Sequence, residues 1–186
     1  MLQWTRTFSG LSTLQDEPTD MAMDASGNIV IAGVSDSSAA ENTLAIKYNT
    51  GGDSVWVRNY SFTANDYERP ASIHLDNSSN VILTGYCSNP DQRDFATLKY
   101  NSSGVLQWAR KYYGAQHTND RANSVITDKN GNVYTIGKYQ TNNGDTFIIT
   151  KYNSAGVLKW TYQDVLPFYD EGVDIKVDAN GFVYYV

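Results

Sequence analysis

Four acidic side chains recur at equivalent places, each eight residues before an aspartate that opens a turn: Asp16, Glu68, Asp120 and Asp170. Carboxylate oxygens are ligands that Ca²⁺ prefers. If the repeated units were arranged in a ring around an axis, these four acids would surround the mouth of its central channel and would form a cation site. The favoured interpretation is structural, in which each carboxylate accepts hydrogen bonds from backbone or from arginine and locks neighbouring units together. Arg69 and Arg121 directly follow two of the four acids. We therefore expect no metal site and keep the cation ring as the alternative.

The other reactive side chains do not form a catalytic pattern. One lysine recurs in every full unit: Lys47, Lys99 and Lys151. An active-site lysine is expected once, so each of these is predicted to pack its stem along a sheet and to pair its amine with an acid. His74, His117 and Cys87 show no spacing typical of a metal site or of a nucleophile and its base. The chain is predicted not to be an enzyme and to need no cofactor.

A fixed spacing connects these positions. Four tryptophans follow one another at intervals of 52 residues: Trp4, Trp56, Trp108 and Trp160. Three turn aspartates and three glycines share that interval: Asp24, Asp76, Asp128, Gly33, Gly85 and Gly137. A fourth turn aspartate, Asp178, follows slightly early. A constant period of this length indicates tandem copies of one supersecondary unit.

Each unit contains four short strands joined by tight turns. In the second unit, runs of β-branched and aromatic residues predict strands at 71–76, 80–87, 94–101 and 105–113. The second and third strands carry apolar side chains on both faces, and stacking the units around an axis would bury both faces. The sequence therefore predicts an all-β fold, a β-propeller of four-stranded antiparallel blades, with three complete blades plus partial blades at both ends.

The repeat also sets the boundaries within a single segment, 1–186. Partial units are predicted at 1–9 and 164–186, and full units at about 10–61, 62–113 and 114–163. The repeated tryptophan is expected to pack onto a neighbouring blade beside a glycine. In the first turn of the second unit Ser79 replaces the glycine of the other units, so this turn is predicted to be strained or differently built.

The two partial units leave one blade without its third strand. The chain begins on a predicted fourth strand, 2–9, and stops on a predicted second strand, 182–186. Either the repeat continues in a longer protein, which we favour, or the ends complete one another between copies and give oligomers or fibres. The expected partners are other copies of the chain or neighbouring repeats.

Two stretches of the repeat resemble a known family. Asp-x-x-Gly-Asn-Val-Tyr-x-x-Gly, followed by Phe-x-x-x-Lys-Tyr-Asn-Ser-x-Gly-Val-Leu-x-Trp, resembles the bacterial SBBP-type β-propeller repeat. The second stretch is also similar to the Trp-docking motif of quinoprotein propellers. The resemblance covers essentially the whole chain. It implies an extracellular or bacterial cell-surface location and a scaffold-like role, without naming a partner.

Composition narrows the partners further. The net charge is −6 and the isoelectric point about 4.7, so the chain lacks the basic field that binds phosphate backbones, and nucleic acid is not expected as a partner. No stretch approaches the roughly 20 apolar residues that span a bilayer, so no membrane span is expected.

These observations favour a non-catalytic structural or adhesion scaffold in a bacterial surface protein or fibre. Loops that differ between units, at 35–42, 88–93 and 140–144, are the expected contact surface for a surface protein or a glycan. The most apolar loop contributes three candidate contact residues: Leu166, Phe168 and Tyr169. The alternative is a carbohydrate- or small-ligand-binding propeller module, which the many tyrosines favour.

Overall fold

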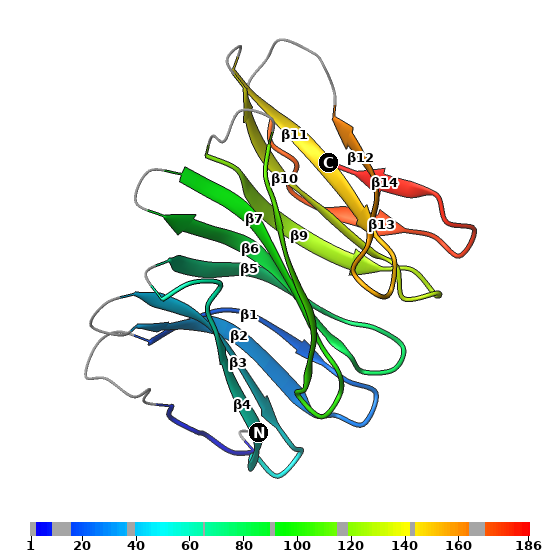
Figure 1. Cartoon of the computed structure of the whole chain (residues 1–186). Coiled ribbons are helices and arrows are strands. Elements are labelled where there is room, and N and C mark those ends of the chain that lie inside the picture. The colour runs from blue at the N-terminus through cyan, green and yellow to red at the C-terminus, as the bar shows by residue number, and fades with distance from the viewer. Residues whose placement is uncertain are drawn as a thin grey trace.

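The computed structural model describes residues 3–8, 16–36, 40–64, 66–89, 92–114, 119–141, 144–163 and 170–186. In this part of the chain every regular element is a β-strand (Figure 1). Blade 1 contains β1 (Asp16–Met23), β2 (Ile29–Asp36), β3 (Glu41–Tyr48) and β4 (Ser54–Tyr60). Blade 2 contains β5 (Tyr67–Leu75), β6 (Val81–Asn89), β7 (Gln92–Tyr100) and β8 (Leu106–Tyr112). Blade 3 contains β9 (Arg121–Thr127), β10 (Val133–Thr141), β11 (Gly144–Tyr152) and β12 (Leu158–Gln163), and a terminal hairpin contains β13 (Ile175–Val177) and β14 (Val183–Tyr185).

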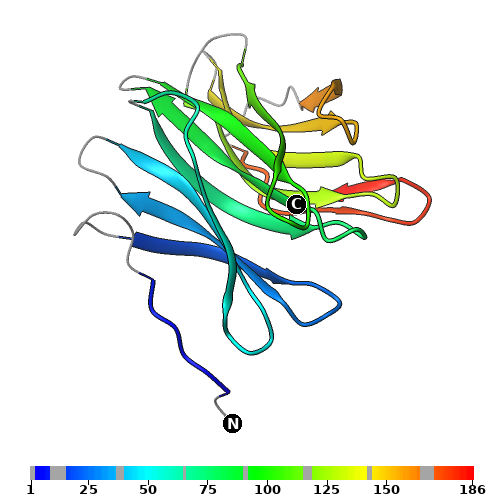
Figure 2. The ribbon, with the colours of Figure 1, turned by 60° about the horizontal axis from the view of Figure 1, so that its bottom comes forward.

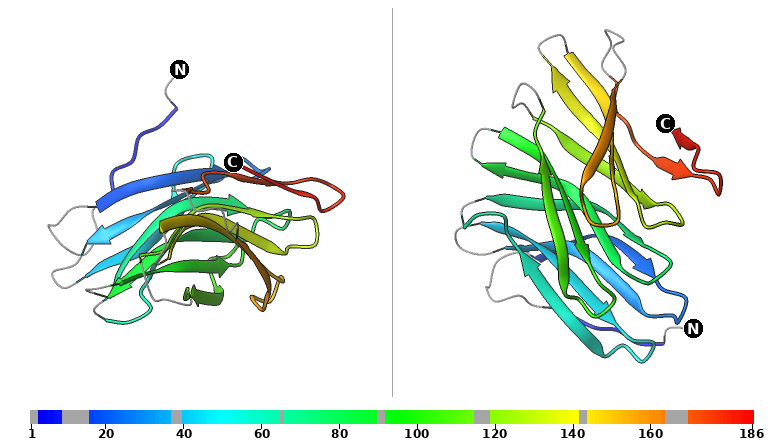
Figure 3. Two further views of the ribbon diagram at one scale, coloured as in Figure 1. Left: turned by 90° about the horizontal axis from the view of Figure 1, so that it is seen from above. Right: turned by 45° about the vertical axis from the view of Figure 1, so that its right-hand side comes forward.

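Each blade is an antiparallel sheet with its strands in chain order. The blades stack side by side, and the terminal hairpin lies beyond blade 3 (Figures 1 and 3). The first strand of each blade, here called the inner strand, contacts the inner strand of the next blade. Residues 3–8 leave the stack on the side of blade 1 (Figure 2). The prediction of propeller blades is confirmed.

The apolar core lies between the blades. One cluster joins Val30 and Ala32 of blade 1 to Ile73 and Leu83 of blade 2. A second cluster joins blade 2 to blade 3, and a third joins blade 3 to Ile175 of the terminal hairpin. Because each sheet buries its apolar side chains against its neighbours, the stability of a blade depends on the blades beside it.

The repeated glycine of the second strand allows a bulge in the inner strand. A Cβ on Gly85 would lie 2.1 Å from the Arg69 carbonyl oxygen, and the register between β5 and β6 shifts beside it, between Pro70 and Ser72. Equivalent shifts lie beside Gly33 and Gly137. A side chain here would displace the inner strand, which explains why glycine recurs at this position.

The turn between the first and second strands is built by its aspartate. Asp76 Oδ1 accepts hydrogen bonds from the backbone N–H groups of Ser78 and Asn80, at 2.9 and 3.0 Å. Asp24, Asp128 and Asp178 make the same pair of contacts. The residue before the asparagine adopts a left-handed conformation, and Ser79 does so with φ 57° although it is not glycine. The predicted strain at Ser79 is therefore confirmed, in a turn of otherwise unchanged design.

Replacing Ser79 by glycine is expected to stabilise the protein, because a residue with a Cβ pays roughly 1 kcal/mol in the left-handed region. We expect S79G to raise the free energy of unfolding by about 0.5–1 kcal/mol in urea titrations. The matched control is G131S at the same place in blade 3, where φ is 74° and a Cβ would meet only an ordinary contact at 3.6 Å. G131S should lower the free energy of unfolding. If both changes shifted the free energy of unfolding in the same direction, the interpretation would be contradicted.

Some predicted bounds are wrong. β5 begins at Tyr67 and not at residue 71, because the bulge lets the inner strand continue past Pro70 without leaving the sheet. The loops predicted at 35–42, 88–93 and 140–144 are largely strand in their described residues. The reason is that β2 pairs with β3 out to Asp36, β6 with β7 out to Asn89 and β10 with β11 out to Thr141. Residues 3–8 form no strand, because none of the described strands pairs with them through the backbone. Leu166, Phe168 and Tyr169 lie outside the described residues.

Candidate functional site

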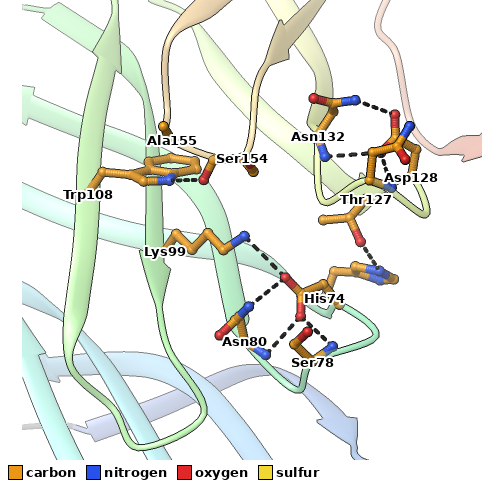
Figure 4. A network of polar contacts seen from close by, with 12 residues as sticks. His74, Ser78, Asn80, Lys99, Trp108, Thr127, Asp128, Asn132, Ser154 and Ala155 are labelled. Carbon is orange, nitrogen blue, oxygen red and sulfur yellow. Dashed lines mark hydrogen bonds and ion pairs between the residues drawn. The ribbon is translucent and has the colours of Figure 1, made fainter.

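The repeated tryptophan joins each blade to the next. Trp56 lies on β4, and its indole N–H donates to the Ser102 carbonyl oxygen in blade 2 at 3.2 Å. The ring lies flat against Gly104, where a Cβ would come within 2.8 Å of it. Trp108 repeats this contact on Ser154 and Gly156 of blade 3 (Figure 4). We call this arrangement the Trp-docking contact, and it confirms the predicted packing beside a glycine.

Two further side chains complete the Trp-docking contact. Tyr100 of blade 2 packs against Trp56 with ring centroids 6.4 Å apart. Arg58 lies over the same indole, 5.8 Å from its centroid, and its Nε donates to the Gly104 carbonyl oxygen at 2.6 Å. Arg110 and Tyr152 occupy the same places around Trp108. The indole thus contacts a guanidinium and a tyrosine ring as well as the glycine turn, and only 6% of Trp56 is exposed.

Trp4 makes the same contact from a segment that is not a strand. Its indole N–H donates to the Thr50 carbonyl oxygen at 3.2 Å, and its ring covers Gly52 and Tyr48. A cavity of 220 Å³ lies beneath residues 3–8, with a mainly apolar lining that includes Ile31, Leu44 and Ile46 of blade 1. In blade 2 the corresponding strands are covered by blade 1. The cavity therefore lies on the face of blade 1 that corresponds to a buried face of blade 2.

The repeated lysines form buried ion pairs in two blades. Lys47 lies 3.0 Å from Asp24, and Lys99 lies 3.1 Å from Asp76, with all four side chains almost fully buried. Figure 4 shows the contact of Lys99. Burial acts to raise the pKa of Asp24, but the hydrogen bonds from Asn28 and Lys47 outweigh it and lower that pKa to about 2. The predicted pairing of a lysine amine with an acid is found for these two lysines.

For Lys151 the predicted pairing is wrong. Tyr134 replaces the aliphatic residue of the other blades, and its hydroxyl donates to Asp128 at 3.1 Å. Lys151 Nζ lies 4.8 Å from the centroid of the Tyr134 ring. Because the larger tyrosine stands between the lysine and the aspartate, the ion pair gives way to a cation–π contact.

This difference predicts unequal costs of removing the lysines. K99M leaves the buried Asp76 carboxylate without its counter-charge, so we expect a loss of roughly 3 kcal/mol in the free energy of unfolding. K151M removes the contacts of the amine with Tyr134 and Trp160 but takes no ion-pair partner from a buried acid, so it is expected to cost about 1 kcal/mol. Urea unfolding of both variants near neutral pH measures the difference. A larger loss for K151M would contradict the assignment.

The four predicted acids differ in their surroundings. Glu68 is fully buried, and its Oε1 accepts hydrogen bonds from the Phe62 N–H at 2.7 Å and the Ser61 hydroxyl at 3.1 Å. Asp120 is also buried and accepts from the Gln140 N–H at 2.9 Å. Asp170 is exposed and Asp16 partly so. Among the described residues, no three His, Cys, Asp or Glu side chains lie close enough together to hold a metal ion.

Arg69 and Arg121 do lock neighbouring units, but through other acids than predicted. Arg69 of blade 2 pairs with Glu17 of blade 1, and its other nitrogen lies 3.8 Å from Glu41. Arg121 of blade 3 makes two contacts with Glu171, at 2.7 and 2.9 Å. Glu17 and Glu171 each lie one position after a predicted carboxylate, and each pairs with an arginine of the adjacent blade.

Burial raises the pKa of Glu68 to about 7, although hydrogen bonds from Phe62 and Ser61 oppose the shift. A carboxyl group with a raised pKa in the folded state stabilises the fold less as the pH rises from its ordinary value through 7. E68Q is neutral at every pH and removes this dependence. We expect the stability of E68Q relative to the unchanged protein to increase between about pH 4 and about pH 8, by up to about 3 kcal/mol.

Urea titrations of both proteins at the two pH values measure this difference. D66N removes a nearby acid that is paired with Lys111 at 2.6 Å and whose charge helps to raise the pKa of Glu68, so it should reduce the pH-dependent difference without abolishing it. A stability difference between E68Q and the unchanged protein that stays constant with pH would contradict a titrating Glu68.

The other singled-out residues take part in packing. His74 contacts the Thr127 hydroxyl of blade 3 at 3.1 Å, and burial lowers its pKa (Figure 4). Cys87 is buried, and burial raises the pKa of its thiol to about 12, so the reactive thiolate is suppressed. His117 lies outside the described residues. No helix in the described part of the chain could cross a membrane.

Within the part of the chain that the structure describes, no glycine turn of another blade is found against Trp160. Trp160 lies on β12 at the position of Trp56 and Trp108, yet 38% of it is exposed against 6% for each of those two. Its ring meets Tyr134 and Lys151 of its own blade. Tyr162, at the position of Arg58 and Arg110, is 47% exposed. The outer strand of blade 3 therefore presents a docking surface that the preceding outer strands bury.

Comparison with protein families points to the stretch from the start of β8 to the start of β11. A family model described as SBBP: Beta-propeller repeat matches residues 107–144. This stretch is similar to an SBBP repeat. The predicted resemblance to SBBP repeats is therefore confirmed, and the 52-residue spacing relates the other blades to the matched one. No curated protein sequence matches the chain.

Among solved structures, a polysaccharide lyase has a similar fold. It is described as a new family, PL25 ulvan lyase, bound to -[GlcA(1-4)Rha3S]-. The TM-score is 0.55 at 11% sequence identity, and the match covers 77% of this chain and 42% of the lyase chain. At this identity the likeness shows the fold alone. The chain thus spans less than half the length of that lyase.

Proposed function

We propose that the chain is a non-catalytic scaffold segment of an extracellular or cell-surface protein. One observation carries the proposal: the side chains that recur in every unit make contacts within or between blades. The tryptophan and arginine bind turn carbonyls of the next blade, and the turn aspartate holds its own turn and, in two blades, a lysine. In an enzyme we would expect polar and charged side chains to gather in one unit and to face a substrate. Here the recurring polar and charged side chains instead make contacts within and between blades.

The location and the partners follow from the SBBP resemblance and from the surface. Bacterial SBBP-type repeats are associated with secreted and surface proteins, which supports an extracellular site for this chain. The exposed Trp160 and the cavity beneath residues 3–8 are both surfaces that blades elsewhere in the stack cover. We therefore take further blades of the same repeat as the principal partners, either in other copies or in neighbouring repeats.

A second candidate function is carbohydrate binding. A groove of 270 Å³ lies between the turns of blades 2 and 3, and its lining includes Asn77, Ser78, Lys129 and Asn130. Amide, hydroxyl and amine groups of this kind hydrogen-bond sugar hydroxyls and sulfates. The likeness to a lyase solved with a bound saccharide adds to this candidate at the level of fold.

An experiment with polysaccharides distinguishes a scaffold, a carbohydrate-binding module and an enzyme that cleaves polysaccharide. The protein is incubated with sulfated and unsulfated polysaccharides, ulvan included, and new reducing ends and retention on immobilised polysaccharide are both measured. The scaffold proposal predicts neither cleavage nor retention. New reducing ends would overturn the non-catalytic proposal.

Saturable retention would favour the carbohydrate-binding candidate if the groove variant N130A, with K129A, abolished it. The matched control is N180A, because Asn180 occupies the same turn position in the terminal hairpin, outside the groove. Retention that N180A and the groove variant reduce equally would point to a surface other than the groove.

A further inference from the structure

One buried ion pair in blade 2 does not belong to the repeat. Asp66 lies just before β5, and its Oδ2 is 2.6 Å from the Nζ of Lys111 on β8. One period away on either side, the corresponding residues are neither acids nor lysines: Leu14, Asn59, Thr118 and Gln163. The contacts that every blade shares therefore do not explain why this pair is present.

The pair is largely closed off from water. Only 8% of the Asp66 side chain and 18% of the Lys111 side chain are exposed. The amine also lies 4.9 Å from the centroid of the Phe62 ring, in the connection between blades 1 and 2. Two buried charges carry a desolvation cost that a neutral group does not carry. A reaction that removes both charges is therefore favoured by these surroundings.

A third group, Glu68, lies near the pair. It is fully buried, and its Oε1 accepts hydrogen bonds from the Phe62 N–H and the Ser61 hydroxyl. Its Oε2 is also buried and makes no hydrogen bond to the described residues. Burial raises the pKa of Glu68 to about 7, and the charges of Asp66 and Lys111 act on the same pKa. Near neutral pH this carboxyl group can thus both give and take a proton.

The other buried ion pair of blade 2 has a different environment. Lys99 lies 3.1 Å from Asp76, whose Oδ1 also accepts hydrogen bonds from the backbone N–H groups of Ser78 and Asn80. Burial acts to raise the pKa of Asp76, but the hydrogen bonds with Asn80 and Lys99 outweigh it and lower that pKa. A carboxylate that several donors hold in its ionised form resists attack by an amine.

We propose that Lys111 and Asp66 condense to form an amide, an isopeptide bond within blade 2, and that Glu68 moves the proton that this reaction requires. The bond ties the connection before β5 to the outer strand β8, across 45 residues of chain. Because a cross-link over such a loop restricts the unfolded chain, it stabilises the folded blade. The inference goes beyond the scaffold function and does not rest on it, since the bond lies within one blade.

The amine needs a partner that takes its proton. Burial acts to lower the pKa of Lys111, but its hydrogen bond to Asp66 outweighs burial and raises that pKa. The Glu68 carboxyl group gives its proton to the Asp66 carboxylate and then takes one from the Lys111 ammonium. The contact between the two reacting groups already has the proximity that the attack requires.

The bond-forming step balances without any other reactant. The neutral amine of Lys111 attacks Cγ of Asp66, so that the Nζ–Cγ bond forms and one Cγ–O bond breaks. The leaving oxygen takes the proton of the Asp66 acid and one proton of the amine. One water molecule is released, Glu68 is protonated again, and no atom is oxidised or reduced.

The intact mass of the whole chain tests the proposal. It should be lower than the mass of the sequence by one water molecule, and protease digestion followed by mass spectrometry should give two peptides joined through Asp66 and Lys111. The Lys99–Asp76 pair in the same sample is the internal control, and these two residues should be found in separate peptides.

Two variants test the roles of the amine and of the buried acid. K111R keeps a cation beside Asp66, but its guanidinium stays protonated and cannot attack, so this variant should have its full mass. E68Q keeps the shape of the side chain but cannot exchange the proton, and it should slow the loss of water by at least about 100-fold. The matched control K99R should lose water like the unchanged protein, and circular dichroism checks the fold of all three variants.

Three outcomes would overturn the proposal. The folded, unchanged protein would keep its full mass after prolonged incubation near neutral pH. Water would be lost at another place, as in a cyclised aspartate, with Asp66 and Lys111 in separate peptides. Folded E68Q would form the bond as fast as the unchanged protein, so that Glu68 would have no part in it. None of these results bears on the scaffold function, which the polysaccharide experiment tests separately.

Discussion

The contact between an indole and a glycine turn of the following blade fixes how the sheets are placed. Apolar clusters between neighbouring sheets supply much of the free energy of stacking, but burial is not directional and would allow the sheets to slide. The hydrogen bond from Trp56 to the Ser102 carbonyl oxygen is directional, and it acts at the outer strand, remote from the inner strands β1 and β5. Together with Arg58 on the Gly104 carbonyl, it sets the angle at which blade 2 meets blade 1.

This contact explains why several residue types recur as a set. The turn must contain glycine because an added Cβ would enter the indole ring, and because its φ of 77° at Gly104 is left-handed. Lys99 is the register partner of Trp108 between β7 and β8. The buried ion pair of Lys99 with Asp76 therefore lies next to the tryptophan that docks on blade 3. Loss of one member exposes or crowds the others, and substitutions at these positions should be strongly coupled.

The sequence predicted the blades well because their residues obey the repeat. Tryptophan, glycine and aspartate recur at one spacing, and strands with two apolar faces have few ways to bury both. Pairings that depend on a single residue could not be read from the period. Tyr134 stands where Ile82 stands in blade 2, and this change alone separates Lys151 from Asp128. Because of the bulge at Pro70, β5 extends far enough to include Glu68. Arg69 pairs with Glu17 because the inner strands of adjacent blades lie side by side, and the period of the sequence does not show which of their residues face one another.

The forward reach of each tryptophan has a consequence for biosynthesis. Trp56 binds a carbonyl 46 residues later in the chain, and Trp108 does the same. As the polypeptide leaves the ribosome, each outer strand therefore waits for most of the next blade before its indole can dock. During synthesis the most recently completed blade therefore always has an exposed tryptophan. Each blade docks fully only after most of the next blade has been translated. A chaperone that binds exposed aromatic side chains of nascent chains would thus find one exposed repeat tryptophan at a time, a different one after each blade is completed.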